Sequence, residues 1–252
     1  TNSQSRSMEE ALRKSGIAYR IIGGLSFYQR KEIKDLMGYF RYVVNQEDEE
    51  AFKRIINYPK RGIGNTSVEK LLLGAYEHDI SLWKVLTNSQ SFLSGRGANA
   101  VSDFCTMINS FKMEIERKDA FEAATSIAKQ SGLLRDLYED KTIEGLNRYE
   151  NVQELLNAIK EYVDNDENED KSLGAFLQEI ALLTDEDQNK NDQDAVTMMT
   201  IHSSKGLEFR YVFVVGMEED LFPSQMMMQS REDLEEERRL FYVATTRAME
   251  KL

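Results

Sequence analysis

The sequence has little cysteine, proline, histidine or tryptophan, and it has no long apolar run. Its 252 residues include one Cys, two Pro, two His and one Trp. The single cysteine, Cys105, excludes an internal disulfide framework and is typical of a reducing compartment, so we expect a cytoplasmic protein. Cys105 lies in an apolar helical pattern, which predicts a core residue rather than a nucleophile. No apolar stretch approaches the roughly 18 residues of a membrane-spanning helix, so we expect no membrane partner.

Further absences concern chemistry and the ends of the chain. No G-x-x-x-x-G-K-[ST] segment, the loop that cradles nucleotide phosphates, occurs in the sequence. The two histidines, His78 and His202, are far apart, and no segment resembles a metal cluster, so we expect no metal site. The chain begins at Thr1 without an initiator Met or a signal segment and stops abruptly at Leu252. We therefore expect it to be part of a longer protein.

The acidic charge is concentrated in one region. The net charge is −12, and residues 139–194 alone hold 5 basic and 17 acidic side chains, so the remainder is balanced. Residues 1–61 hold 12 basic and 8 acidic side chains. The overall acidity therefore does not exclude a phosphate-bearing partner for the N-terminal part. The acidic region is either a solvated surface or a docking face for a protein.

The periodicity of apolar residues indicates a mixed α/β chain. Short β-branched runs occur near both ends, at residues 18–22, 196–201 and 211–215. Helical spacing dominates from about residue 31 to residue 183, and it also predicts a first helix over 5–16 and a last helix from about Asp233 to Lys251. Met8, Ala11 and Leu12 form the expected apolar face of the first helix. This order predicts an α/β domain interrupted by a large helical insertion.

The loop after residue 201 is a candidate ligand site. It carries His202, two serines, Lys205 and Gly206 between two strand-like runs. Ligands of α/β proteins bind at the carboxyl ends of strands, and His202 and Lys205 could contact phosphate there. The alternative is an ordinary connecting loop whose His and Lys are solvated.

The last predicted helix carries an arginine on its apolar side. Leu240, Val243, Ala244 and Arg247 recur at steps of three and four residues. Because burial of an unpaired guanidinium is costly, Arg247 requires an anionic partner. The partner is either a nucleotide phosphate at a domain interface or a structural carboxylate.

A third candidate is the turn at residues 59–67. Gly62-Ile63-Gly64 permits a tight turn, and the Asn, Thr or Ser that follows can cap a helix. Amide groups at a helix start bind phosphate without reading base sequence, and Lys60 and Arg61 would add positive charge. The alternative is a plain interhelical turn.

Taken together and in order, these segments resemble the UvrD/Rep family of superfamily 1 DNA helicases, of the PcrA/UvrD type. TNSQSR (Thr1–Arg6) is similar to a segment early in the second RecA-like domain of that family. GGLSFYQRKEIKD (Gly23–Asp35) is similar to motif IVa. TIHSSKGLEF (Thr200–Phe209) and EEERRLFYVATTRA (Glu235–Ala248) resemble motifs V and VI. The resemblance covers nearly the whole chain, and motifs V and VI are long and specific.

The resemblance implies a nucleotide half-site. In this family ATP binds between two RecA-like domains, 1A and 2A, and Arg247 would be the arginine finger on the γ-phosphate, the catalytic residue. Glu208 would contact the ribose. The Walker A loop and the acidic residues for Mg²⁺ belong to domain 1A, which this chain lacks. We therefore expect the parent protein to use ATP and Mg²⁺ and the isolated chain to be inactive and to bind neither tightly.

The resemblance also implies contacts with DNA. Thr200 and His202 would lie beside single-stranded DNA, with Lys205 supporting the same loop. Lys60, Arg61, Gly62 and Gly64 would grip duplex DNA. Phe27 and Arg30 would lie near the strand or the domain hinge.

The expected fold class is therefore α/β, an incomplete second RecA-like domain with a P-loop NTPase-like parallel sheet and a large all-helical insertion. The expected domains are 1–46 and 193–252 for domain 2A, and 47–192 for the helical domain 2B. The expected function of the parent is ATP-dependent 3′–5′ DNA translocation and unwinding. Two alternatives remain: a helicase–nuclease subunit, and a DNA- or protein-interaction module that keeps the fold without the motor.

Overall fold

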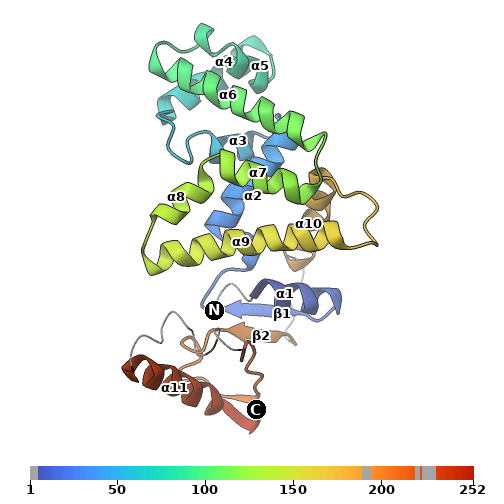
Figure 1. Ribbon diagram of the computed structural model, residues 1–252, viewed down its shortest axis with the longest axis vertical. Coiled ribbons are helices and arrows are strands. Elements are labelled where there is room, and N and C mark those ends of the chain that lie inside the picture. The colour runs from blue at the N-terminus through green and yellow to red at the C-terminus, as the bar shows by residue number, and fades with distance from the viewer. Residues whose placement is uncertain (1–4, 189–193, 219–221, 223–230) are drawn as a thin grey trace. The chain divides into compact units, whose positions relative to one another are not determined.

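The computed structural model describes residues 5–188, 194–218, 222 and 231–252, and these fold as two compact units (Figure 1). The first unit joins the two ends of the chain, Thr1–Phe27 and Lys190–Leu252. The second unit is the continuous segment Tyr28–Asn189. A mixed α/β chain, mostly helical with small parallel sheets, is therefore confirmed.

Where the structure describes it, the first unit contains short parallel strands and two α-helices. Strand β1 pairs with β2, from Tyr19 opposite Val196 to Ile22 opposite Met199, and β3 pairs with β4 through an irregular register. The described strands form two separate two-stranded sheets rather than one larger sheet. The elements of this unit are α1 (Ser5–Lys14), β1 (Tyr19–Ile22), β2 (Val196–Met199), β3 (Phe209–Tyr211), α11 (Arg231–Thr245) and β4 (Ala248–Lys251).

Two sequence expectations for this unit were wrong at their boundaries. The last helix ends at Thr245 rather than continuing to Lys251, because Ala248–Lys251 pairs with β3 as strand β4. The strand expected at residues 211–215 ends at Tyr211. The amide of Val212 still donates to the carbonyl of Lys251, the last residue of β4, at 3.0 Å. The next residue, Phe213, is 88% exposed. Pairing with a neighbour therefore decided both boundaries.

The buried face of α1 is charged, which differs from the expected face of Met8, Ala11 and Leu12. Ala11 is exposed, whereas Arg6, Glu9 and Arg13 are buried. The Glu9 carboxylate accepts hydrogen bonds from the Ser26 hydroxyl at 2.6 Å and the Phe27 amide at 3.1 Å. These bonds compensate the burial of the carboxylate and attach the segment after β1 to α1.

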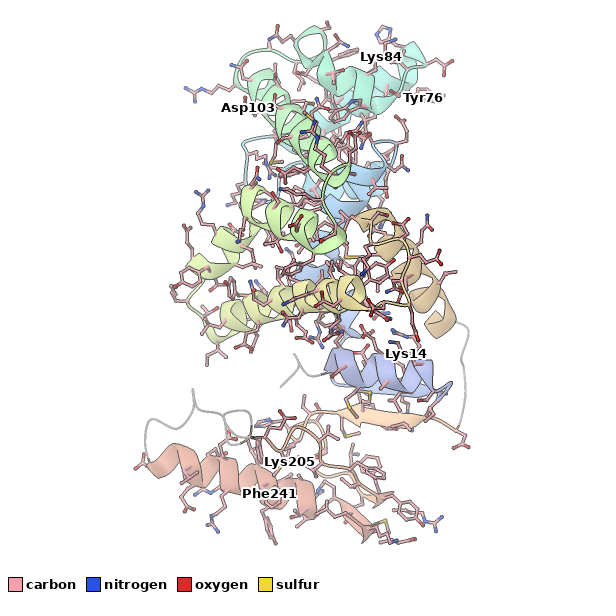
Figure 2. The ribbon with its side chains drawn as sticks, turned by 45° about the vertical axis from the view of Figure 1, so that its right-hand side comes forward. Lys14, Tyr76, Lys84, Asp103, Lys205 and Phe241 are labelled. Atoms are coloured by element: carbon pink, nitrogen blue, oxygen red, sulfur yellow. The ribbon has the colours of Figure 1, made fainter. Side chains whose placement is uncertain are left out.

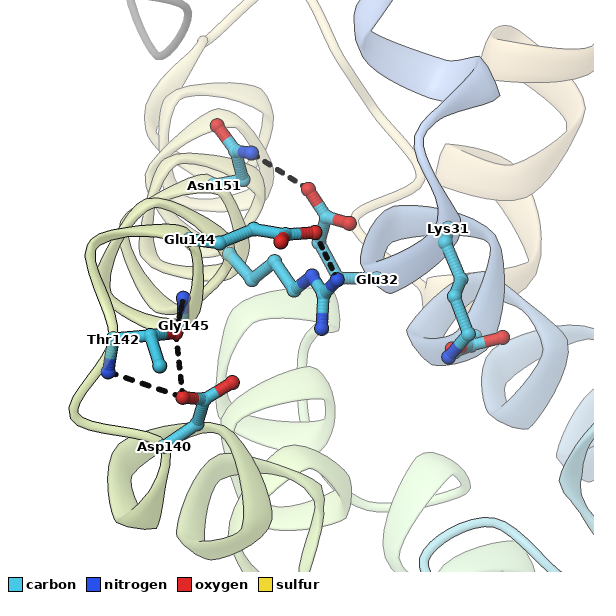
Figure 3. A network of polar contacts seen from close by, with 9 residues as sticks. Lys31, Glu32, Asp140, Thr142, Glu144, Gly145 and Asn151 are labelled. Carbon is cyan, nitrogen blue, oxygen red and sulfur yellow. Dashed lines mark hydrogen bonds and ion pairs between the residues drawn. The ribbon is translucent and has the colours of Figure 1, made fainter.

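The second unit is entirely helical in its described elements. They are η2 (Phe27–Gln29, which spans the unit boundary), α2 (Lys31–Val44), α3 (Glu49–Ile55), α4 (Asn65–His78), α5 (Leu82–Thr87), η3 (Ser89–Ser91), α6 (Arg96–Ile115), α7 (Ala120–Gln130), α8 (Leu133–Glu139), α9 (Ile143–Asp164) and α10 (Leu173–Gln188). Side-chain caps start several of them: Asp48, Asp119 and Thr142 each accept a first-turn amide at 2.8–3.0 Å. Figure 3 shows the Thr142 cap at the start of α9.

Helix α2 is the centre of this unit, and it packs against α3, α6, α7, α9 and α10. Its apolar residues at three- and four-residue steps, including Ile33, Leu36 and Phe40, are fully buried. The ring of Tyr42 lies 5.8–6.1 Å from the rings of Phe52, Trp83 and Phe104. Cys105 is buried beside this aromatic cluster, as predicted, and His78 is exposed, as predicted.

Helix α2 belongs to the second compact unit. This unit begins at Tyr28, whereas we expected the helical insertion to begin at residue 47. Ile33, Leu36 and Phe40 of α2 are fully buried, and the helix packs against other helices of the same unit. The domain boundaries expected from the sequence, at residues 47 and 192, stay predictions.

Candidate functional site

The loop that follows β2 is folded as a hydrogen-bonded turn. Thr200 accepts a hydrogen bond from the Ser203 amide at 3.2 Å through its hydroxyl, and the two hydroxyls are 2.9 Å apart. The Ser204 hydroxyl donates to the Ile201 carbonyl at 2.7 Å. These local bonds satisfy the serines and threonine within the turn, so the hydroxyls serve first to fix its shape.

The ends of β1 and β2 lie together at one edge of their sheet. Gly23, which follows β1, has a φ of +77°, and a Cβ at this position would overlap the side chain of Ser203. Only glycine therefore permits this approach between the turn after β1 and the turn after β2. The arrangement agrees with the expectation that the loop after residue 201 lies at the carboxyl edge of parallel strands.

Three of the predicted contact residues project from this turn into solvent. His202, Lys205 and Glu208 are all exposed. Within the described part of the chain, none of the three side chains makes a hydrogen bond or an ion pair. Figure 2 labels Lys205 in the unit that also contains Phe241 of α11. The turn therefore presents one carboxylate, one imidazole and one ammonium group that are not used in the fold.

Arg247 lies in the turn between α11 and β4 and is half-buried. Its guanidinium donates to the carbonyls of Val243 at 3.0 Å and Leu207 at 2.8 Å, and to the Thr246 hydroxyl at 3.0 Å. Leu207, whose carbonyl accepts this hydrogen bond, directly precedes Glu208 in the chain. The segments that resemble motifs V and VI are thus joined by one side chain.

The partners of Arg247 bear on the sequence argument that it requires an anion. Among the residues that the structure describes, no carboxylate lies within ion-pair distance of its guanidinium. Carbonyl and hydroxyl oxygens satisfy its hydrogen bonds but do not neutralise its charge. A structural carboxylate, the simpler alternative, is therefore not its partner in the described part of the chain, and the positive charge is available to a phosphate.

The glycine turn of the helical unit is held by side chains that the sequence did not single out. Gly62 has a φ of +77°, and Gly64 is the N-cap of α4 without a side-chain cap. The Asn57 side chain accepts hydrogen bonds from the amides of Arg61 at 2.9 Å and Ile63 at 3.1 Å. The glycines are exposed, so the turn offers backbone groups to a ligand.

Lys60 and Arg61 differ in what they contact. Lys60 is exposed, and its ammonium group makes no hydrogen bond or ion pair within the described residues. The Arg61 guanidinium donates to the Tyr39 hydroxyl at 2.5 Å and to the carbonyls of Ile55 and Ser131 at 2.9 and 3.0 Å. Burial raises the pKa of Tyr39 to about 12, although the adjacent Arg61 opposes this rise. Arg61 therefore ties the turn to the helical core, and Lys60 is the freely exposed cation of the pair.

Phe27 and Arg30 are both buried. Phe27 is 0% exposed, and its amide is held by Glu9. Arg30 donates to the Asn151 amide oxygen at 2.8 Å. The Asn151 nitrogen donates in turn to Glu32 at 2.6 Å, as Figure 3 shows. These two residues thus contact protein rather than solvent, and Asn151, on α9, is a supporting residue that no sequence motif indicated.

Comparison with known proteins assigns the family. A family model described as the UvrD-like helicase C-terminal domain matches residues 1–252. The chain belongs to this family. It is 43% identical over 256 residues to "DNA helicase II" of Escherichia coli and 43% identical over 256 residues to "DNA helicase II" of Salmonella typhimurium. It is 40% identical over 259 residues to "ATP-dependent DNA helicase PcrA" of Bacillus subtilis. Each comparison covers 100% of this chain and 35% of the relative, so the chain spans about a third of the length of these relatives.

Two further properties of this UvrD-like domain concern ligands and membranes. Within the described ranges, no group of three or more His, Cys, Asp or Glu side chains is arranged to hold a metal ion. No helix in that part of the chain is long and apolar enough to cross a bilayer.

Proposed function

We propose that this UvrD-like domain is the C-terminal part of an ATP-dependent DNA helicase that translocates 3′ to 5′ on single-stranded DNA. The observation that supports the proposal most directly is the Arg247–Leu207 hydrogen bond. It joins an un-neutralised cation to the loop that carries Glu208, His202 and Lys205. We further propose that the protein is cytoplasmic and acts in DNA repair.

The proposed nucleotide half-site consists of Arg247 and Glu208. ATP supplies the phosphoanhydride bond whose hydrolysis drives the motor. Arg247 would place its charge on the γ-phosphate, where it stabilises the negative charge of phosphoryl transfer. Glu208 would hold the ribose through its exposed carboxylate. The residues present fit the phosphate and ribose sides, and we expect the Walker A loop and the Mg²⁺ ligands to come from an N-terminal RecA-like domain, 1A.

The proposed DNA contacts fall in both units. In the α/β unit, Thr200, His202 and Lys205 belong to the turn beside the single strand, and the exposed His202 and Lys205 would reach phosphates. In the helical unit, Lys60 and the exposed amides at Gly62 and Gly64 would contact duplex DNA. Arg61 would hold that turn in shape. Phe27 and Arg30 would act near the strand through the backbone that they support, because their own side chains are buried.

The proposal predicts a selective loss of turnover in the parent protein. Arg247→Lys keeps the charge but loses the planar fork, and we expect the DNA-stimulated ATPase kcat to fall about 1,000-fold. Affinity for single-stranded DNA should stay near that of the wild type. The measurement is steady-state ATPase activity with a parallel DNA-binding titration.

Arg239→Lys is the matched control, because Arg239 is an exposed residue of α11, the helix that precedes Arg247, and pairs with Glu236. It should leave kcat unchanged. Equal losses in both variants, or an Arg247→Lys enzyme with full kcat, would exclude the proposed catalytic role. The isolated chain should show no ATPase activity, and Arg247-dependent turnover by it would contradict the half-site.

A further inference from the structure

The turns that follow β1 and β2 lie against each other in the α/β unit. The paired strands end together, with Ile22 opposite Met199, and they lie side by side in Figure 1. Gly23 is the first residue after β1, and Ser203 belongs to the turn after β2. A Cβ built on Gly23 would overlap the Ser203 hydroxyl oxygen and would lie 3.0 Å from the Ser203 Cβ. The contact therefore depends on the absence of a side chain at Gly23.

The turn that Gly23 contacts is the one that carries the exposed His202 and Lys205. Ser203 is half-buried between them in the sequence. Its hydroxyl lies 2.9 Å from the Thr200 hydroxyl, and its amide donates to the same Thr200 oxygen at 3.2 Å. The Lys205 amide donates to the His202 carbonyl at 3.3 Å. Because these bonds connect the turn internally, a displacement of Ser203 also displaces His202 and Lys205.

The segment that carries Gly23 is attached on both sides. Before Gly23, strand β1 is paired with β2 along its length. After Gly23, the Glu9 carboxylate accepts hydrogen bonds from the Ser26 hydroxyl at 2.6 Å and from the Phe27 amide at 3.1 Å. A side chain added at Gly23 would therefore displace the turn that carries Ser203 rather than its own segment.

We propose that Gly23 is a positioning residue for DNA binding, whose contact with Ser203 fixes the direction in which His202 and Lys205 project. The inference rests on the proposed contact of this turn with single-stranded DNA and deepens it. Gly23 itself touches no ligand and acts through Ser203. A side chain contacts a phosphate only within hydrogen-bond distance. A displaced turn therefore binds DNA less tightly even when every DNA-contacting residue is kept.

The test measures the ATPase activity of the parent protein as a function of the concentration of single-stranded DNA. Gly23→Ala should raise the DNA concentration for half-maximal activity about 10-fold and leave kcat at saturating DNA within about 2-fold. We expect kcat to stay because Arg247 keeps its hydrogen bonds to Val243 and Thr246. A binding titration with a labelled single strand should show the same loss of affinity.

Gly16→Ala is the matched control for backbone strain. Gly16 also has a positive φ, +67°, in the same unit, but a Cβ there meets no described atom within 4 Å. This variant should lose stability, as any side chain in the left-handed region does, and should keep the half-saturating DNA concentration of the wild type.

Ser203→Gly provides the second control, because it removes both atoms that an alanine at position 23 would overlap. Combined with Gly23→Ala, it should restore most of the lost affinity, so the effects of the two substitutions should not add. Thermal unfolding of every variant checks that the assay temperature lies below its transition.

The outcomes separate this inference from the proposed function. Weaker DNA binding in Gly23→Ala that Ser203→Gly relieves, with wild-type binding in Gly16→Ala, supports the positioning role. If Gly23→Ala alone did not fold, recovery of folding and DNA binding in the double variant would support it equally. Unchanged half-saturation in Gly23→Ala, or a loss that Ser203→Gly does not relieve, overturns the positioning role and leaves the proposed function in place. Wild-type ATPase activity that single-stranded DNA does not stimulate overturns both.

Discussion

At the scale of single residues, two equally buried tyrosines of α2 differ in the hydrogen bonds of their hydroxyl groups. Tyr39 and Tyr42 are both 0% exposed. The Tyr39 hydroxyl donates to the Tyr58 carbonyl at 2.5 Å and accepts from Arg61. The Tyr42 hydroxyl is buried without a hydrogen-bond partner among the described residues, and burial raises the pKa of Tyr42. The first phenol thus organises the glycine turn, and the second only fills the aromatic core.

This difference predicts opposite responses to loss of the hydroxyl. Tyr39→Phe should lower the free energy of unfolding by about 1–3 kcal/mol, because it leaves a carbonyl and a guanidinium donor unsatisfied. Tyr42→Phe should leave the free energy of unfolding unchanged or raise it, because it removes a polar group that is buried without a partner. Urea titration of the two variants measures both values. A Tyr42→Phe variant as unstable as Tyr39→Phe would contradict the assignment.

Cys105 gives a prediction that depends on pH. Burial raises the pKa of its thiol from 9.0 to about 12. Because the folded-state pKa is raised, this group contributes stability that is complete below pH 9 and is lost as the pH rises toward 12. Alkylation of the native protein at pH 8 should be slow and should become fast in denaturant, as a timed iodoacetamide reaction can measure. Fast native alkylation would show that the thiol is accessible.

At the scale of elements, α1 shows how a charged helix face can be the buried one. The sequence suggested an apolar face at Met8, Ala11 and Leu12, but Glu9 is 1% exposed and holds both Ser26 and Phe27. The helix itself was predictable from spacing. Its orientation was not, because the partners of Glu9 are 17 and 18 residues away in the chain.

Glu9→Gln tests this attachment. The substitution keeps the shape but removes the charge that strengthens the bonds to Ser26 and Phe27, so we expect a loss of stability of about 1.5–3 kcal/mol. Amide exchange at Phe27 should accelerate in the same variant, which hydrogen exchange followed by NMR detects. Unchanged protection of that amide would mean that the carboxylate does not hold the segment.

The end of α11 and the end of β3 could not be predicted from the sequence. Helical spacing through Arg247 correctly predicted α11 but extended it into Ala248–Lys251, whose residues suit a helix. Pairing with β3, some forty residues earlier, overrides that local preference. The same dependence on distant partners kept Asn151 out of the predicted site, because Arg30 and Glu32 are more than a hundred residues away in the chain. Arg247, His202, Lys205 and Glu208 were predicted as site residues because they fall in long motifs, and their roles stay predictions.

At the scale of the whole molecule, the two units differ in what they expose. The α/β unit presents His202, Lys205 and Glu208, which have no hydrogen-bond or ion-pair partner among the described residues. The helical unit presents the glycine turn with the exposed Lys60, whereas the acidity of the chain is concentrated in residues 139–194. A chain of net charge −12 thus retains exposed cations, so its total charge does not describe every part of its surface.

The hydrogen bond between Arg247 and the Leu207 carbonyl has a mechanical consequence. The turn at residues 200–207 and the guanidinium are tethered at 2.8 Å, so a displacement of one is transmitted to the other without any change in the helices. A bound DNA strand that displaced His202 or Lys205 would also displace the Arg247 guanidinium. A phosphate that attracted Arg247 would likewise displace the turn. The Leu207 carbonyl oxygen therefore couples the position of the turn to the position of the guanidinium, beside the backbone hydrogen bond from the Phe209 amide to the Arg247 carbonyl.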